Sequence, residues 1–176
     1  IKSELEALGE AFVSTSDTEV ILRAYKHWGE NCVNRFNGMW AFGIYDSIAK
    51  TVFISRDRFG IKPLYYINTD DKFAFGSEIK QMIAFGVSPH VNMPRIADYL
   101  LVGYSNHTRE TFFKDIYQLE PGHNLTLELK GVNPIINKYY EIGQGTKTLG
   151  HNEADAIDGY IKTLNKSIEL RLRSDV

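Results

Sequence analysis

Residues 39–75, MWAFGIYDSIAKTVFISRDRFGIKPLYYINTDDKFAF, are the stretch of sequence that decides the fold. Residues 39–45 are apolar on both faces, which predicts a strand that is covered on both sides. Residues 51–56 alternate between apolar and polar side chains, and two further short runs follow at 64–67 and 72–75. Short polar turns separate these runs, so the sequence predicts strands joined as an antiparallel meander.

The sequence before this stretch predicts helices. Residues 1–8 place their apolar side chains on one helical face. Ser16 is followed three residues later by Glu19, which is the pattern of a capping box. We therefore expect a helix that starts behind Ser16 and ends at Gly29, and a short second helix over about residues 30–36.

The sequence after the strands predicts two more helices and another strand. Ser77 can cap a helix that runs to about Phe85. A second helix covers roughly residues 93–101. Residues 125–129 alternate Leu with Thr and Glu, which is typical of a strand.

The C-terminal part is expected to be a linker followed by a helix. Residues 141–152 are rich in Gly and contain little that could pack, so we interpret them as the linker. Asn152 can cap the helix behind them. Its apolar stripe consists of Ile157, Ile161, Leu164, Ile168 and Leu172. An amphipathic helix is marginal alone in water, so this stripe needs a partner surface.

Composition excludes several classes of function. The chain has 176 residues and a net charge of −2, so no basic excess attracts nucleic acid or an anionic membrane. Its 43% hydrophobic and 24% charged residues are typical of a globular protein. No apolar run is long enough to span a bilayer. One cysteine excludes an internal disulfide and fits a cytoplasmic location, and no metal site is expected.

Several motifs follow one another in a distinctive order. They are Ser16–Val20, Phe36–Phe42, Arg56–Tyr66, Ser77–Lys80, Pro121–His123, Lys138–Tyr140 and Arg171–Val176. Together they resemble the glutaminase half of glutamine-dependent asparagine synthetases, which are class II glutamine amidotransferases. The likeness covers nearly the whole chain, and RDRFGIKPLYY at residues 56–66 is its strongest part.

The resemblance implies an α+β fold. The expected architecture is part of an αββα sandwich of antiparallel sheets, like that of N-terminal-nucleophile hydrolases, plus the first helix of an α/β synthetase domain. Residues 1–140 would be the C-terminal portion of the glutaminase domain, residues 141–152 the linker, and residues 153–176 the start of the ATP-binding synthetase domain.

The resemblance also implies an activity for the parent protein. Glutamine would be hydrolysed to glutamate and ammonia, and the ammonia would pass through an internal channel to a second site. There ATP, with Mg, would activate aspartate as an adenylate, and ammonia would displace AMP to give asparagine. The parent is expected to be a homodimer, with ATP and Mg bound outside this segment and no nucleic-acid or membrane partner.

The catalytic groups of the family are expected outside this chain. Its nucleophile is an amino-terminal Cys, whereas residue 1 here is Ile. Its carboxylate-binding arginine and its oxyanion-hole Asn-Gly pair would lie upstream, and its pyrophosphate loop would follow Val176. We therefore expect a segment of a longer protein that is inactive and only marginally stable by itself, with apolar faces such as residues 39–45 left uncovered.

One ligand residue is carried over by the resemblance. Asp17 matches the family's aspartate that binds the α-ammonium of glutamine. A helix N-terminus favours an ionised carboxylate, and a charged acceptor binds an ammonium group well. The residues alone favour the simpler interpretation of Asp17 as an ordinary acid at the start of a helix, and the resemblance reverses that preference.

Other residues that could carry chemistry have a simpler interpretation. Cys32 fits a buried, inert thiol better than a nucleophile. Residues 56–58, Arg-Asp-Arg, fit a structural ion-pair cluster better than a phosphate site. Glu78, with Lys80, fits the start of a helix. The histidines lack the spacing of metal ligands and fit solvated or locally bonded side chains: His27, His90, His107, His123 and His151.

Two functional alternatives stay open at this point. The parent could be a paralogue that amidates another acceptor, such as a sugar acid in surface-polysaccharide assembly, because the acceptor site lies outside this chain. The chain could also be a catalytically dead domain with a binding or regulatory role, because the nucleophile is absent from residue 1.

Overall fold

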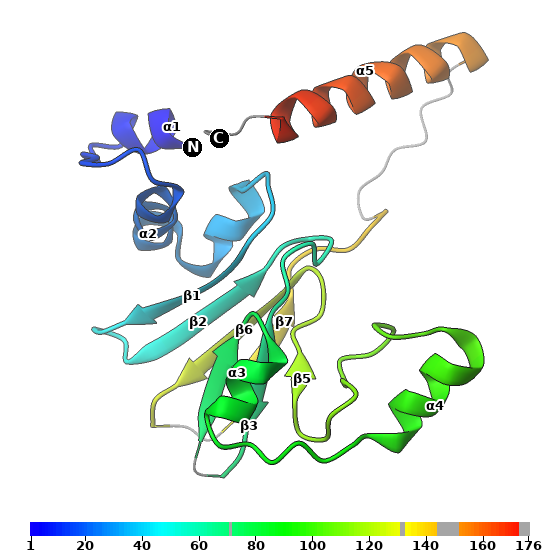
Figure 1. The fold of residues 1–176 in the computed structure, drawn as a ribbon. Coiled ribbons are helices and arrows are strands. Elements are labelled where there is room, and N and C mark those ends of the chain that lie inside the picture. Colours follow the sequence, from blue (N-terminus) through cyan, green and yellow to red (C-terminus); the bar gives the residue numbers. More distant parts are fainter. Residues whose placement is uncertain (71, 131–132, 144–151, 173–176) are drawn as a thin grey trace. The chain divides into compact units, whose positions relative to one another are not determined.

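The structure is a computed structural model that describes residues 1–70, 72–130, 133–143 and 152–172. The chain divides into two compact units, residues 1–141 and residues 142–176 (Figure 1). The first unit contains two antiparallel sheets with helices and has the expected α+β character. The second contains helix α5 (Glu153–Arg171).

The first sheet has four strands in the order β1-β2-β6-β7. Their bounds are β1 (Ala41–Asp46), β2 (Thr51–Arg56), β6 (His123–Glu128) and β7 (Ile135–Lys138). All neighbours are antiparallel. Strand β2 is central: Ile54 pairs with Gly43 of β1 on one side and with Leu125 of β6 on the other.

The second sheet has three strands in the order β4-β3-β5, with bounds β3 (Tyr65–Asn68), β4 (Phe73–Gly76) and β5 (Tyr117–Gln118). The predicted continuous meander is therefore wrong. Hairpins β1–β2 and β3–β4 belong to different sheets. The reason is the corner at residues 57–64, which carries the chain from one sheet to the other instead of turning it back.

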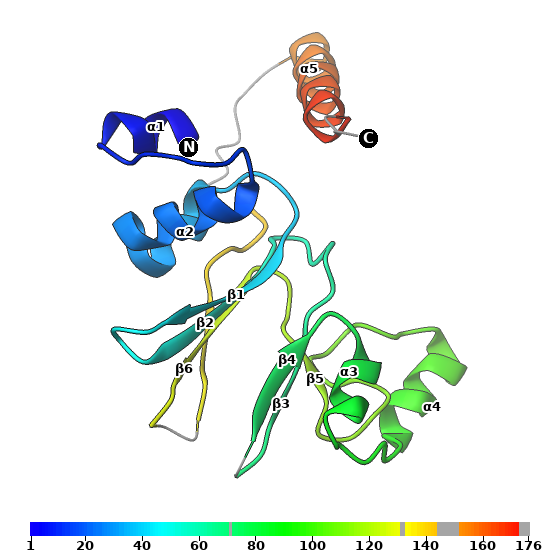
Figure 2. The same ribbon diagram turned by 60° about the vertical axis from the view of Figure 1, so that its left-hand side comes forward.

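The two sheets face each other as separate layers (Figure 2). A buried apolar cluster joins them: Ile54, Leu64, Tyr66, Leu119, Leu125 and Leu127. Helix α2 (Asp17–Trp28) lies over the outer face of the first sheet, and α3 (Ile79–Ala84) lies over the second. Each helix seals its own cluster of buried side chains against its sheet. The expected layers of helix, sheet, sheet and helix are therefore present in this unit.

The remaining helices of the first unit are α1 (Lys2–Ala7), the 3₁₀ helix η1 (Gly29–Arg35) and α4 (Met93–Val102). The predicted ends of α2 are confirmed, since Ser16 is its N-cap and Gly29 ends it with φ of 56°. The predicted capping box is wrong. Ser16 Oγ accepts from the N–H of Thr18 at 3.2 Å, and the Glu19 carboxylate turns back to Val13 and Ser14.

Helix α3 begins one residue later than predicted. Its N-cap is Glu78, not Ser77, and the Glu78 N–H donates to Gln81 Oε1 at 3.0 Å. The predicted helix-start role of Glu78 is therefore confirmed. The predicted end is correct, because Phe85 is the C-cap and Gly86 follows with φ of 105°.

The strand buried on both faces is β2, not β1 as predicted. Phe53 and Ile54 of β2 point to opposite faces and are fully buried. Strand β1 is at the edge of its sheet, so its side chains are covered less completely. Met39 is 44% exposed and Tyr45 is 54% exposed, which confirms that this stretch is left partly uncovered in the chain.

The short strands β5 and β7 have no counterpart in the sequence prediction. The expected linker at residues 141–152 lies mostly outside the described residues, which resume at Asn152. Helix α5 is present as predicted, and Asn152 Oδ1 accepts from the N–H of Asp155 at 2.9 Å. Its apolar stripe is solvent-exposed within the second unit. Among the described helices, none combines the length and apolar character that crossing a bilayer requires.

Candidate functional site

A pocket of about 180 Å³ lies at the N-terminal end of α2. It is lined by Ile1, Asp17, Val20, Ile21, Phe36, Asn37, Gly38, Met39 and Trp40. Helix α2 supplies one wall, and the segment between η1 and β1 supplies another. Pockets for drug-sized ligands measure roughly 300–1,000 Å³, so this one suits a smaller molecule.

Asp17 is the acidic residue of this pocket. It is the first residue of α2, and it is exposed. Within the described part of the chain, its carboxylate has no hydrogen-bond or ion-pair partner. A helix N-terminus favours negative charge, and a carboxylate without an internal partner can accept a cationic group.

The unpaired backbone groups at the start of α2 are satisfied by residues other than Asp17. Ser16 Oγ binds the N–H of Thr18 at 3.2 Å, and the Ser16 carbonyl accepts from the N–H of Glu19 at 3.2 Å. Asp17 is an acid in the first turn of α2, as its simpler interpretation expects, and it does not cap the helix. Its side chain is left available to the pocket.

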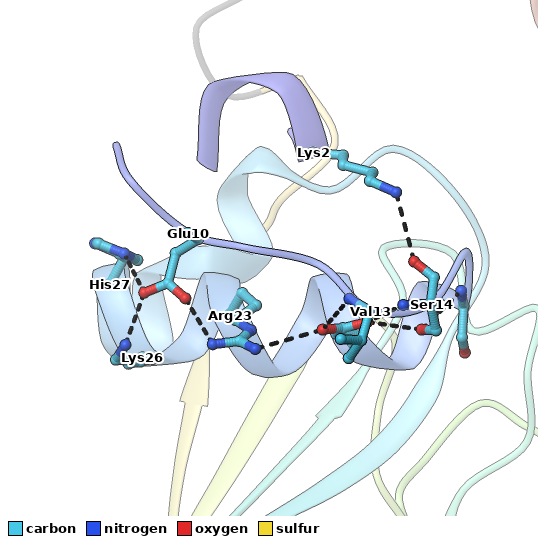
Figure 3. Close-up of polar contacts among 9 residues, drawn as sticks. Lys2, Glu10, Val13, Ser14, Arg23, Lys26 and His27 are labelled. Atoms are coloured by element: carbon cyan, nitrogen blue, oxygen red, sulfur yellow. Dashed lines mark hydrogen bonds and ion pairs between the residues drawn. The ribbon is translucent and has the colours of Figure 1, made fainter. Parts of the chain in front are cut away.

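Two carboxylates attach the segment between α1 and α2 to helix α2. Glu10 accepts from Arg23 at 2.8 Å and from Lys26 at 2.7 Å, and it lies 2.9 Å from His27 Nε2 (Figure 3). These hydrogen bonds, led by the one from Lys26, lower the pKa of Glu10 to about 2. The contacts fix one end of the segment against the C-terminal half of α2.

Glu19 binds the other end of this segment. Its carboxylate accepts from Ser14 Oγ at 2.7 Å, from the N–H of Ser14 at 2.8 Å and from the N–H of Val13 at 3.2 Å. Figure 3 shows Val13 and Ser14 within this set of contacts. The Ser14 hydroxyl is the main cause of a Glu19 pKa that is lowered to about 2.

Asp57, which is 1% exposed, binds the backbone of a residue in the pocket wall. One carboxylate oxygen accepts from the N–H groups of Phe59 and Ile61 at 3.1 and 3.0 Å. The other accepts from the N–H groups of Lys62 at 2.9 Å and Trp40 at 3.3 Å. One side chain therefore closes the corner between the sheets and also fixes Trp40 in the pocket wall.

The two arginines beside Asp57 also bind backbone. Arg56 donates to the carbonyls of Lys62 and Gly60 at 2.8 and 2.9 Å, and burial lowers its pKa. Arg58 donates to the Phe36 carbonyl, which also belongs to the pocket wall. The predicted structural role is confirmed, but the predicted ion pair is wrong. In the described region these arginines bind carbonyls and not the Asp57 carboxylate.

The other candidate residues that the structure describes lie outside the pocket, and His151 is outside the described residues. Cys32 is fully buried, and burial raises its thiol pKa to about 11, as expected for an inert side chain. Glu78 pairs with Lys80 on the surface at 2.5 Å. His107 lies 3.0 Å from Asp98, and His123 lies 2.8 Å from the Pro121 carbonyl. No group of three or more potential metal ligands occurs among the residues described.

Sequence reasoning missed most of this arrangement. The resemblance identified Asp17 as a site residue. The motif Phe36–Phe42 contains the residues of the opposite wall, but the sequence did not indicate that they would lie in the same pocket as Asp17. Glu10 and its partners on α2 are 13 to 17 residues apart in sequence, so no local pattern connects them. The only sequence signal for Glu19 was its spacing from Ser16, which suggested a different hydrogen bond.

The two facing sheets with helices outside define a sandwich of the kind found in glutamine-using amidotransferases. The fold is similar to that of the glutamine phosphoribosylpyrophosphate amidotransferase from B. subtilis, solved in complex with ADP and GMP. The TM-score is 0.51 with 22% identity, over 79% of this chain and 26% of that chain. This likeness supports the fold alone.

The family follows from the sequence comparison. The model of the glutamine amidotransferase domain matches residues 1–140, so the chain belongs to this family. It is 36% identical to asparagine synthetase [glutamine-hydrolyzing] 3 of Bacillus subtilis, over 81% of this chain and 23% of that protein. It is 34% identical to a putative asparagine synthetase [glutamine-hydrolyzing] 2 of Methanocaldococcus jannaschii, over 92% of this chain and 31% of that protein. The chain therefore spans less than a third of these relatives.

Proposed function

We propose that this chain provides part of the glutamine site of an asparagine-forming enzyme, with Asp17 binding the α-ammonium group of glutamine. The observation that carries the proposal is the free carboxylate of Asp17 at the helix N-terminus, inside a pocket of about 180 Å³. An amino acid is small enough for such a site. Its ammonium group would form a charge-assisted hydrogen bond with the carboxylate.

In this proposal, the rest of the pocket orients the substrate. Phe36, Met39 and Trp40 contribute apolar surface, which would exclude water around the ammonium–carboxylate pair and strengthen it. The buried Asp57 carboxylate keeps Trp40 in place through the 3.3 Å contact to its N–H. These residues bind and orient the substrate. The nucleophile is proposed to lie outside residues 1–176, so this chain by itself would not hydrolyse glutamine.

The names of the relatives support aspartate as the acceptor of the ammonia in the parent protein. We propose that ATP and Mg act on the acceptor in the part of those proteins that this chain does not cover. The described residues of this chain offer no cluster suited to a metal ion. Helix α5 would begin that ATP-binding domain, and the parent would be a homodimer.

The direct test is Asp17→Asn in the full-length parent protein. Glutamine-dependent synthesis should lose about 10- to 100-fold in kcat/KM, because one charged hydrogen bond to the substrate is removed. Synthesis from free ammonia should stay unchanged, since that route does not use the glutamine pocket. Steady-state assays with each nitrogen source measure both.

A matched control is Glu6→Gln, which removes an exposed carboxylate of α1 that does not line the pocket. It should leave both activities unchanged. Equal loss of the two activities in Asp17→Asn would remove Asp17 from the glutamine site. Aspartate-dependent release of AMP by the unmodified parent tests the acceptor separately, and its absence would favour an enzyme that amidates another acceptor.

A further inference from the structure

We propose that Glu19 is a positioning residue for Asp17: it fixes the turn before α2 and so sets where the Asp17 carboxylate lies in the pocket. This inference rests on the proposed function of Asp17. It adds a residue that does not line the pocket, because Glu19 lies two positions further along the helix. Its carboxylate points back to the preceding segment.

The Glu19 carboxylate gathers three donors from two consecutive residues, and Arg23 of the same helix lies 3.4 Å from it while also binding Glu10. Both oxygens lie 3.2 Å from the N–H of Val13, and one of them also binds the N–H and the hydroxyl of Ser14 at 2.8 and 2.7 Å. The Glu19 side chain is 14% exposed, and the contacts lie at the surface because Val13 and Ser14 are exposed. The convergence of several donors on one anion fixes the path of residues 13 and 14 relative to the first turn of α2.

The contacts continue from Ser14 to the residues on each side of Asp17. Ser14 Oγ accepts from the N–H of Ser16 at 3.3 Å, and Ser16 Oγ accepts from the N–H of Thr18 at 3.2 Å. The chain of hydrogen bonds thus runs from Glu19 through Ser14 and Ser16 to Thr18. Asp17 lies between the last two members, and its own carboxylate takes no part.

This arrangement explains why the first acidic residue of the helix is not needed to bind the N–H groups of the first turn. In many helices an acidic side chain in the first turn binds the free N–H groups, so its carboxylate is not available to a ligand. Here the Ser16 hydroxyl binds the N–H of Thr18 and the Ser16 carbonyl binds the N–H of Glu19. The backbone on both sides of Asp17 is therefore fixed, and Asp17 lines the pocket without an internal partner for its carboxylate in the described structure.

The test uses Glu19→Gln in the full-length parent. Glutamine keeps the length of the side chain but replaces one acceptor oxygen with an NH₂ group, so it cannot accept all three donors. The KM for glutamine should rise at least about tenfold, because small errors in placement weaken substrate binding strongly. The ammonia-dependent activity should be unchanged, and it reports that the protein is folded.

Glu10→Gln is the matched control for a loss of stability alone. Its carboxylate also has a pKa of about 2 and attaches the same segment to α2, but through Lys26 and His27 at the end of α2 that is far from the pocket. It should lower the thermal midpoint without raising the KM for glutamine. Ser14→Ala, a milder change, should raise that KM by an intermediate amount because it removes only one of the three donors.

The outcomes separate this inference from the proposal on which it rests. If Asp17→Asn impairs glutamine use but Glu19→Gln raises the KM no more than Glu10→Gln does, Glu19 is not a positioning residue. If Asp17→Asn has no effect on glutamine use, the proposed function itself is wrong. A fall in both activities in Glu19→Gln, with Ser14→Ala unaffected, would also overturn the inference, because it would show a purely structural role.

Discussion

Asp17 and Asp57 are both acidic residues near the same pocket, and their surroundings give them different roles. Asp57 is buried and binds four backbone N–H groups, so its carboxylate has no capacity left for a ligand. Asp17 is exposed, and no described residue binds its carboxylate. Hydrogen-bond partners, and not residue type, thus distinguish the structural acid Asp57 from Asp17, for which we propose a binding role.

Replacing Asp57 with Asn should destabilise the protein strongly. Two of the four N–H groups would face an NH₂ group instead of an oxygen, and each buried donor left unsatisfied costs about 1–3 kcal/mol. We expect a loss of about 2–5 kcal/mol in the free energy of unfolding, measured by urea denaturation. Glu6→Gln should stay within about 0.5 kcal/mol. A loss below about 1 kcal/mol for Asp57→Asn would contradict the structural role.

At the residue scale, the sequence was informative where the chemistry is local. Ser16, Gly29 and Asn152 end or begin helices as predicted, because caps depend on neighbouring residues. The role of Asp57 was only partly predicted: the corner was recognised as structural, but its partners are backbone groups that no residue pattern reveals. Asp17 was assigned through the family resemblance, since the residues alone favoured a simple helix-start acid.

At the scale of elements, α2 depends on the segment that precedes it. Glu10 of this segment binds Lys26 of the helix, and Glu19 of the helix binds Ser14 of the segment. Local periodicity carries no information about contacts between the helix and the segment before it. The sequence therefore predicted helix α2 but not its attachment to that segment. The same limit explains the incorrect meander, because the pairing of β2 with β6 joins residues about 70 positions apart, as is common for non-local sheets.

The attachment of α2 should make stability depend on pH in the acid range. Both carboxylates have a pKa of about 2 in the folded protein, below the ordinary value of 4.5. Between these two pKa values the unfolded chain binds more protons than the folded chain. The stabilisation that the two carboxylates contribute is therefore fully present above about pH 4.5, and it is lost as the pH falls towards 2. Urea denaturation at pH 6, 4 and 3 measures this loss.

The double variant Glu10→Gln, Glu19→Gln provides the comparison for this pH dependence. It should be less stable than the unmodified chain at pH 6 but should lose less of its remaining stability on acidification. The same loss between pH 6 and pH 3 in both proteins would show that other carboxylates dominate the acid response.

At the scale of the whole molecule, the layers were predictable only through the family resemblance. Periodicity identified individual strands and helices, but it could not distribute the strands between two sheets. The short strands β5 and β7 were missed because two to four residues carry too little pattern. The marginal stability expected of the chain alone stays a prediction, and the exposed apolar side chains of β1 and α4 agree with it.

The central claim is that Asp17 recognises the α-ammonium group of glutamine, and a comparison of two substrates tests it most directly. Glutaramate, which is glutamine without its α-amino group, removes the contact from the substrate side. The unmodified parent should hydrolyse glutamine with a kcat/KM at least about tenfold above that for glutaramate. Asp17→Asn should lower the value for glutamine and leave that for glutaramate unchanged, so that the preference disappears. An equal loss with both substrates would contradict the claim.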